Sequence, residues 1–155
     1  MAERAIYVAV IGASRASPEQ IEQAEAAGRR LAQLGAVVVT GGRGGVMEAA
    51  SRGAKDGGGR TVGILPGLDR SDANAYLDVS LPTGMGEMRN GLVARAAEAV
   101  VAVGGAWGTL AEIAFARAAG TPVFGVGSWD LGADGVVAVD SGAEAAERAV
   151  AAVRS

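Results

Sequence analysis

The chain has 155 residues, of which 50% are hydrophobic and 20% charged, and its formal net charge is −3. This length suits one domain with a sizeable core, and we expect residues 1–155 to form it. The chain contains no cysteine and no histidine, which excludes thiol chemistry, a Ser-His-Asp triad and the usual zinc sites, and we expect no metal site. An acidic chain has no bulk attraction to nucleic acid or to an anionic membrane, so we expect neither as a partner. Because no signal peptide or span of ~20 apolar residues is recognisable, we expect a cytoplasmic protein.

The first half of the chain alternates apolar runs with helical patterns. Residues 5–11 (AIYVAVI) predict a buried strand. Ser17 and Gln20 have the spacing of a capping box, with proline in the first turn, so a helix begins there. Residues 36–40 predict a second strand, residues 46–55 a second helix and residues 60–65 a third strand. The inward face of the first helix, at helical spacing, consists of Ile21, Ala24, Gly28 and Leu31.

The second half continues the alternation. Residues 66–75 form a polar loop, either the rim of a pocket or a solvated connector. A weaker strand is predicted over residues 76–81, a helix from about residue 83 to 97, and a strand buried on both faces over residues 99–103. A helix carrying Leu110 and Ile113, two strands over 121–126 and 136–140, and a helix over 143–153 complete the chain. The inward residues expected around the third helix are Leu92, Val93, Ala96 and Val100.

This regular alternation predicts an α/β fold. We expect a single-domain, Rossmann-like and doubly wound architecture, with a mostly parallel sheet of about seven strands and helices on both faces. Sheets of this kind bind ligands beyond the carboxyl ends of their strands.

Glycine-rich corners follow four of the predicted strands, at residues 12–14, 41–45, 83–89 and 104–109. The corners should gather at one edge of the sheet, where unpaired amides and helix dipoles favour an anion, most often phosphate. Thr109 and Glu112 have an alternative, purely structural interpretation, because their spacing also fits a capping box that only closes a helix end. The convergence of four corners favours the phosphate site. Its candidate residues are Gly12, Ser14, Gly41, Gly42, Arg43, Gly44, Gly45, Met85, Arg89, Asn90, Gly104, Gly105, Trp107, Gly108 and Thr109.

The corner at residues 41–45 matches neither of the two common nucleotide motifs. No Gly-Lys-Ser/Thr follows it, so it is not a Walker motif, and it lacks the G-x-G-x-x-G spacing. No acidic residue ends the second strand to hold a ribose. ATP hydrolysis and ordinary NAD binding are therefore disfavoured.

Three ordered motifs, GGRGGVMEAA at 41–50, GMGEMRN at 84–90 and GGAWGTLAE at 104–112, resemble one superfamily. It contains the "Lonely guy" nucleotide phosphoribohydrolases, long mislabelled lysine decarboxylases, and the molybdenum cofactor carrier proteins. The resemblance implies that the catalytic arginine and glutamate of the hydrolases fall on Arg89 and Glu112. It also implies a phosphate-holding turn at Gly105, Gly108 and Thr109, and a homo-oligomer, either a dimer or a tetramer.

Departures from the hydrolase pattern point to the carrier branch. Gly104 stands where the hydrolases have proline, and Asn90 follows the arginine where they have lysine. Three hypotheses result. The first is a carrier-like protein that binds a phosphorylated pterin or nucleotide, such as molybdopterin or AMP, and requires no cofactor. The second is a phosphoribohydrolase that cleaves the N-glycosidic bond of nucleoside 5′-monophosphates with Arg89 and Glu112, and the third is a nucleotide sensor that catalyses no reaction. The carrier is ranked first. The DNA-processing protein family is a third relative, set aside because the chain is acidic and poor in aromatic residues.

Overall fold

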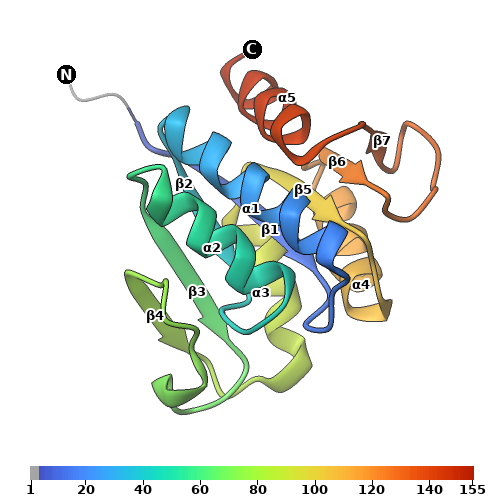
Figure 1. Cartoon of the computed structure of the whole chain (residues 1–155). Helices are drawn as coiled ribbons and strands as arrows, with labels where there is room; N and C mark the ends of the chain where they lie inside the picture. Colours follow the sequence, from blue (N-terminus) through green and yellow to red (C-terminus); the bar gives the residue numbers. More distant parts are fainter. Residues whose placement is uncertain (1–3) are drawn as a thin grey trace.

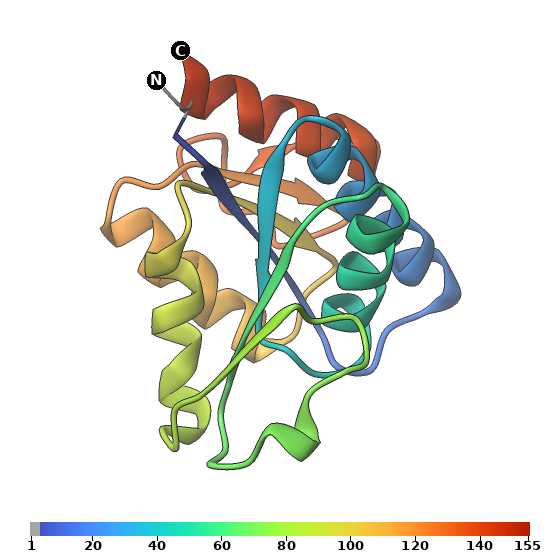
Figure 2. The same cartoon turned by 90° about the vertical axis from the view of Figure 1, so that its left-hand side faces the viewer.

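A computed structural model describes residues 4–155 and has a parallel sheet of seven strands between two layers of helices (Figures 1 and 2). The strands are β1 Ile6–Gly12, β2 Ala36–Thr40, β3 Thr61–Leu65, β4 Val79–Pro82, β5 Ala99–Val103, β6 Val123–Val126 and β7 Val137–Ala138. The helices are α1 Pro18–Gln33, α2 Val46–Asp56, α3 Arg89–Ala96, α4 Trp107–Ala118 and α5 Gly142–Arg154, with short 3-10 helices η1 Arg70–Asp72 and η2 Gly86–Met88. The predicted fold class is confirmed.

The order of the strands creates a switch point beside β1. The order is β4-β3-β2-β1-β5-β6-β7, and every neighbouring pair is parallel. The chain therefore moves outward from β1 to β4 and then returns to the other side of β1 with β5. In open α/β sheets the crevice at such a reversal, outside the carboxyl ends of the strands, is the usual place for a ligand.

The strands alternate their side chains between two cores. Val8 and Val10 of β1 face the layer of α1, α2 and α5, whereas Ala9 and Ile11 face α3 and α4. Figure 2 shows the two helical layers on opposite faces of the sheet. Since both faces are covered, strands such as β5 are buried along their whole length. This explains why the apolar runs were clear strand signals.

Helices α1 and α2 cross in close contact at two glycines. A Cβ atom added to Gly28 would lie 1.9 Å from the carbonyl oxygen of Ala50, and one added to Gly53 would lie 2.0 Å from that of Glu25. The predicted inward face of α1 is largely confirmed, since Ala24, Gly28 and Leu31 are buried. This contact holds the start of α2 near the carboxyl end of β1, where Val46 N–H donates to the Ala13 carbonyl oxygen (3.1 Å).

Three predicted strands are shorter than expected. Strand β4 begins at Val79, because the segment before it is held by polar contacts: Asp78 accepts hydrogen bonds from Thr61 N–H (2.9 Å) and from Lys55 Nζ (2.8 Å). Strand β6 begins after Pro122, which has no N–H to give to a ladder. Strand β7 keeps only two residues.

The expected helix over residues 83–97 is also different. It is divided into η2 and the eight-residue α3, whose first residue is Arg89. Leu92 and Ala96 were expected to face inward, but both are exposed, with Leu92 39% exposed. The other two residues expected to face inward, Val93 and Val100, are buried, and the helix packs on the sheet through Val93 and Ala94. An isolated apolar spacing could not distinguish these two faces.

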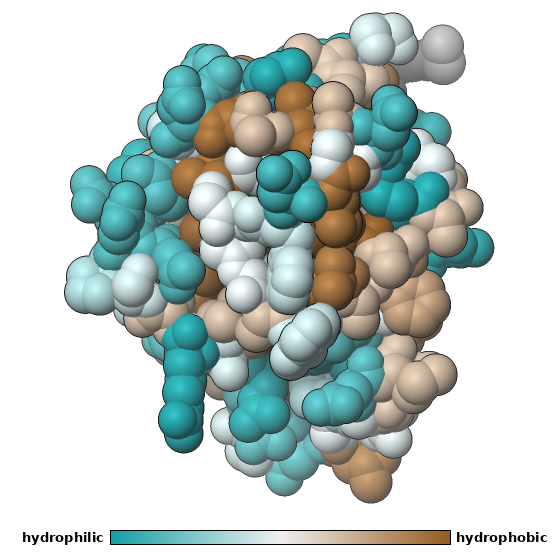
Figure 3. Space-filling model, turned by 90° about the vertical axis from the view of Figure 1, so that its right-hand side faces the viewer, coloured by the Kyte–Doolittle hydropathy of each residue, from teal (hydrophilic) through white to brown (hydrophobic). Residues whose placement is uncertain are grey.

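The two edges of the sheet are its short strands, β4 and β7. Figure 3 views the β7 side, where a narrow strip of hydrophobic residues is flanked by hydrophilic ones. Within residues 4–155, none of the helices combines the length and hydrophobicity that a membrane span requires.

Candidate ligand-binding site

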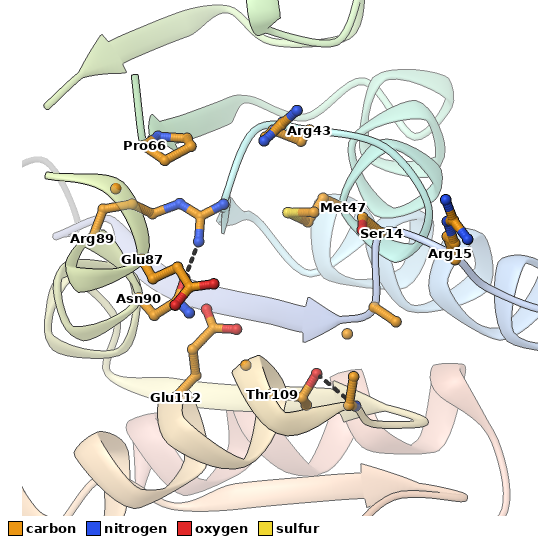
Figure 4. Close-up of a pocket in the computed structure, with 15 residues that line it drawn as sticks. Ser14, Arg15, Arg43, Met47, Pro66, Glu87, Arg89, Asn90, Thr109 and Glu112 are labelled. Atoms are coloured by element: carbon orange, nitrogen blue, oxygen red, sulfur yellow. Dashed lines mark hydrogen bonds between the residues drawn. The ribbon is translucent and has the colours of Figure 1, made fainter. Parts of the chain in front are cut away.

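A cavity of about 620 Å³ opens at the carboxyl ends of β1, β2 and β5, at the switch point of the sheet. Figure 4 shows its walls, which come from the loops after these strands and from the beginnings of α2, α3 and α4. Its lining residues are Gly12, Ala13, Ser14, Arg15, Arg43, Met47, Pro66, Gly86, Glu87, Arg89, Asn90, Ala106, Gly108, Thr109 and Glu112.

One wall of the cavity is the beginning of α4. The chain turns sharply after β5 at Gly104, with φ of 63°, and α4 begins at Trp107. The bond from Leu110 N–H to the Ala106 carbonyl oxygen (3.1 Å) closes the first turn. The amides of Gly108 and Thr109 lie within this turn, so they have no acceptor inside the helix.

The capping-box interpretation of Thr109 and Glu112 is wrong. The helix begins two residues before Thr109, and Thr109 Oγ1 accepts a hydrogen bond from Ala106 N–H (3.4 Å) as the third residue of α4. Glu112 then lies in the second turn, too far along the helix to close its end. It is free to face the cavity, which it lines.

The opposite wall is the beginning of α2. Its N-cap is Gly45, with φ of 64°, and no side chain caps the helix. A Cβ atom on Gly45 would lie 2.3 Å from the Ala13 carbonyl oxygen, so both the conformation and the space require glycine. Met47, in the first turn, lines the cavity. A second uncapped helix start therefore faces the same cavity as α4.

Arg89 is the most constrained cation of the site. Its guanidinium donates to Asn90 Oδ1 and to the Gly41 carbonyl oxygen (3.4 Å), while its Nε is buried without a partner. Burial lowers the pKa of Arg89, and the charge of Glu112 partly offsets this. Among residues 4–155, no carboxylate oxygen lies within 4 Å of its guanidinium nitrogens. This half-buried positive charge therefore borders the cavity without a carboxylate partner.

Glu112 is the buried acid of the site. It is 7% exposed and lines the cavity from α4. Burial raises the pKa of Glu112 to about 8, and the charge of Arg89 acts in the opposite direction without cancelling this effect. The side chain is therefore mostly protonated at pH 7, which removes a negative charge from a cavity otherwise suited to anions.

Two further arginines, Arg15 and Arg43, line the cavity from the loops after β1 and β2. Neither forms an ion pair with another residue of the described range 4–155. The main chain of the second loop is held in place, because Asn74 Nδ2 donates to the Arg43 carbonyl oxygen (3.0 Å). Arg43 thus extends a free cation from an anchored loop.

The structure brings together only part of the predicted set of site residues. Those that line the cavity are Gly12, Ser14, Arg43, Arg89, Asn90, Gly108, Thr109 and Glu112. Those that do not line it are Gly41, Gly42, Gly44, Gly45, Met85, Gly104, Gly105 and Trp107.

The predicted residues outside the cavity lie beside it for identifiable reasons. A Cβ atom on Gly104 would lie 2.3 Å from Gln20 Nε2, and one on Gly105 would lie 2.6 Å from Trp129 Nε1, so both glycines have other neighbours. Trp107 is 77% exposed and its ring lies against that of Trp129, with centroids 5.3 Å apart. These residues shape the turn into α4 without reaching the cavity.

Several lining residues were missed from the sequence, notably Arg15, Met47, Pro66 and Glu87. Arg15 and Met47 directly extend two of the predicted corners. Pro66 follows β3, so the rule that ligands lie beyond the carboxyl ends of strands could have found it. Nothing in the sequence distinguishes Glu87 from an ordinary solvated acid.

A parallel sheet with a cavity at its switch point, faced by two uncapped helix starts and by arginines, defines a Rossmann-like domain with a positively charged cavity. The model of the SLOG cluster4 family matches residues 5–153, and the chain belongs to this family. An uncharacterized protein of Archaeoglobus fulgidus is 39% identical over 118 residues, which cover 76% of this chain and 78% of the relative.

Solved structures of molybdenum cofactor proteins have the same fold over nearly the whole chain. The molybdenum cofactor binding protein of Rippkaea orientalis matches with a TM-score of 0.90 at 31% identity, covering 99% of this chain and 100% of that one. The molybdenum cofactor carrier protein of Chlamydomonas reinhardtii matches with a TM-score of 0.86 at 33% identity, covering 97% and 99%. DNA processing protein A of Streptococcus pneumoniae, 21% identical with a TM-score of 0.73, shares the fold. The predicted resemblance to the carrier-like branch is confirmed.

Proposed function

We propose that the chain binds a phosphorylated pterin or nucleotide in this cavity and does not turn it over. The observation that carries the proposal is that two helix starts without side-chain caps, those of α2 and α4, border one cavity with Arg43 and Arg89. Free amides at a helix start and a nearby guanidinium are the groups that bind phosphate oxygens. The cavity volume of about 620 Å³ lies within the range of small-molecule sites, roughly 300–1,000 Å³.

The similar proteins favour molybdopterin or the molybdenum cofactor as the ligand, with an AMP-like nucleotide as the alternative. The proteins of Rippkaea orientalis and Chlamydomonas reinhardtii are named for binding and carrying the molybdenum cofactor. In this chain the phosphate of such a ligand would lie at Gly108 and Thr109, with Arg43 on the facing loop. The heterocycle would then extend toward Asn90 and Glu112.

The protonation of Glu112 favours binding over hydrolysis. Cleavage of an N-glycosidic bond passes through an oxocarbenium-like transition state. An ionised carboxylate stabilises the positive charge of this state and can also direct a water molecule to attack it. With a pKa of about 8, Glu112 is mostly neutral at pH 7 in the ligand-free protein. Binding of a phosphate by free amides and arginines needs no ionised carboxylate.

A phosphoribohydrolase is the second candidate, because Arg89 and Glu112 line the same cavity. In this case Glu112 would act as the carboxylate and Arg89 would bind phosphate or ribose oxygens. The test is incubation with AMP at pH 7 and pH 9, with free adenine measured by chromatography. The carrier proposal predicts no release. Release that rises with pH and is lost in Glu112→Gln would establish the hydrolase.

Calorimetry with AMP and with molybdopterin tests the binding proposal. Gly108→Val adds a side chain at the cavity wall, where a Cβ atom would meet only Asn90 Nδ2 at 3.5 Å, so the fold should tolerate it. We expect at least a tenfold loss of affinity, because the valine covers the free amides. Ala114→Val, on the exposed side of the same helix, is the matched control and should bind normally. Unchanged affinity in Gly108→Val would place the phosphate elsewhere.

We also propose that the chain self-associates, as a dimer or a tetramer, through α3 and α4. Leu92 and Phe115 are 39% and 44% exposed on these two adjacent helices, and Met88 nearby is 68% exposed. Exposed apolar side chains grouped in this way favour an interface. Light scattering should give a multiple of the 15.3 kDa chain mass for the wild type and a monomer for Phe115→Glu. A monomeric wild type at micromolar concentration would contradict this.

A further inference from the structure

Asn90 and Glu112 form a polar pair at the base of the cavity. They are 9% and 7% exposed, respectively, and both line the cavity. Within residues 4–155, Asn90 takes part in a side-chain hydrogen bond only through Oδ1, and neither its Nδ2 nor the carboxyl group of Glu112 has a partner. The carboxyl oxygens of Glu112 and the amide nitrogen of Asn90 are open to the cavity, so a bound ligand can supply their hydrogen-bond partners.

The orientation of Asn90 is determined by its neighbour. Arg89 Nη1 donates to Asn90 Oδ1, so the amide oxygen is occupied and the amide nitrogen remains as a free donor. Figure 4 shows this nitrogen beside the carboxyl group of Glu112. The base of the cavity therefore presents, when Glu112 is ionised, two acceptors next to one donor.

We propose that Glu112 and Asn90 recognise the 2-amino-4-oxopyrimidine edge that pterins and guanine share. This inference rests on the proposed function and identifies the class of heterocycle. The edge presents an exocyclic amino group, a ring N–H and a carbonyl oxygen in a row, which is the complement of two carboxylate oxygens and an amide donor. Adenine presents a ring nitrogen acceptor where this array needs a donor, so it would oppose a carboxylate oxygen.

Recognition of this edge is coupled to a proton. The charged groups that line the cavity around Glu112 are Arg89 on α3, Glu87 in η2, and Arg15 and Arg43 on the facing loops. None of them forms an ion pair with Glu112 in the part of the chain that the structure describes. The two N–H groups of the ligand stabilise the ionised carboxylate. Binding at pH 7 should thus release a proton, and affinity should rise with pH until Glu112 is ionised in the free protein.

The experiment compares GMP, IMP and AMP by calorimetry at pH 7. All three carry the same ribose 5′-phosphate, and IMP differs from GMP only in lacking the 2-amino group. We expect GMP to bind about tenfold more tightly than IMP, because IMP cannot make the hydrogen bond from the 2-amino group to the carboxylate. AMP should bind most weakly. Repeating the GMP titration in buffers of different ionisation enthalpy should show a released proton. The monophosphate of 6-hydroxymethylpterin distinguishes the two sources of the edge, binding more tightly than GMP if the pterin is the natural ligand.

Glu112→Gln replaces one acceptor by a donor and should reduce the ratio of GMP to IMP affinity to about one. Glu22→Gln makes the same change on the exposed side of α1, outside the cavity, and should leave this ratio unchanged. Equal binding of GMP, IMP and AMP would overturn the edge recognition and leave the phosphate proposal standing. A failure of all three nucleotides and of the pterin to bind would overturn the proposed function itself.

Discussion

Replacing Glu112 with glutamine should stabilise the protein, and the gain should depend on pH. The pKa of Glu112 rises from 4.5 in an unfolded chain to about 8 in the folded one. The folded state thus holds the proton of Glu112 more tightly than the unfolded state does. The contribution of Glu112 to the free energy of unfolding is therefore fully present below pH 4.5 and is lost as the pH rises toward 8. At 1.36 kcal/mol for each pH unit, the cost is about 1 kcal/mol at pH 5, about 3 at pH 7 and about 5 at pH 9. Glutamine has nearly the same shape and carries no charge, so it avoids this cost.

Thermal unfolding at pH 5, 7 and 9, in buffers without phosphate, measures the effect. A domain of this size changes its Tm by about 2–4 °C for each kcal/mol, so Glu112→Gln should raise Tm by roughly 6–12 °C at pH 7 and by only a few degrees at pH 5. Glu87→Gln is the control, because Glu87 is exposed at the rim of the cavity and should produce no pH-dependent gain. An equal Tm difference at the three pH values, or a loss of stability at pH 9, would refute the assignment of Glu112 as a buried acid.

Other predictions concern the helix contact and the cations. Gly53→Ala should lower Tm by at least about 4 °C, because its Cβ atom would lie 2.0 Å from a main-chain oxygen. Gly91→Ala, whose Cβ atom would meet Phe115 at an ordinary 3.5 Å, should leave Tm unchanged or raise it slightly, and equal Tm values for both variants would contradict the close contact. Arg43→Gln should weaken AMP binding about tenfold in calorimetry and reduce its salt dependence, and an unaffected Kd would remove Arg43 from the site.

The sequence was informative where burial or local chemistry decides the structure. Strand β5 is buried on both faces, so its apolar run was recognisable without knowledge of its neighbours. The capping box of Ser17 and Gln20 involves residues three apart, and both of its hydrogen bonds are present (3.2 and 3.0 Å). The position of the cavity followed from a rule of parallel sheets, because the carboxyl ends of the strands share one edge.

The details of the site depend on contacts that sequence spacing does not reveal. Helix α4 begins after the turn at Gly104, which lies next to the side chain of Gln20 in α1. This start places Glu112 in the second turn of α4, facing the cavity, and not in a capping position. The role of Asn90 depends on its hydrogen bond with the adjacent Arg89, which requires α3 to begin at this residue. The position of Glu112 and the role of Asn90 both depend on how neighbouring helices are placed, and a short sequence motif does not indicate this placement.

Free amides at the helix starts are the groups proposed to bind the phosphate. Amide NMR of the ¹⁵N-labelled protein during titration with GMP tests this directly. We predict that the largest shifts fall on Gly108 and Thr109 at the start of α4 and on Met47 at the start of α2, saturating together. Shifts confined to the start of α1, or no shift at these three amides while GMP binds, would contradict this assignment.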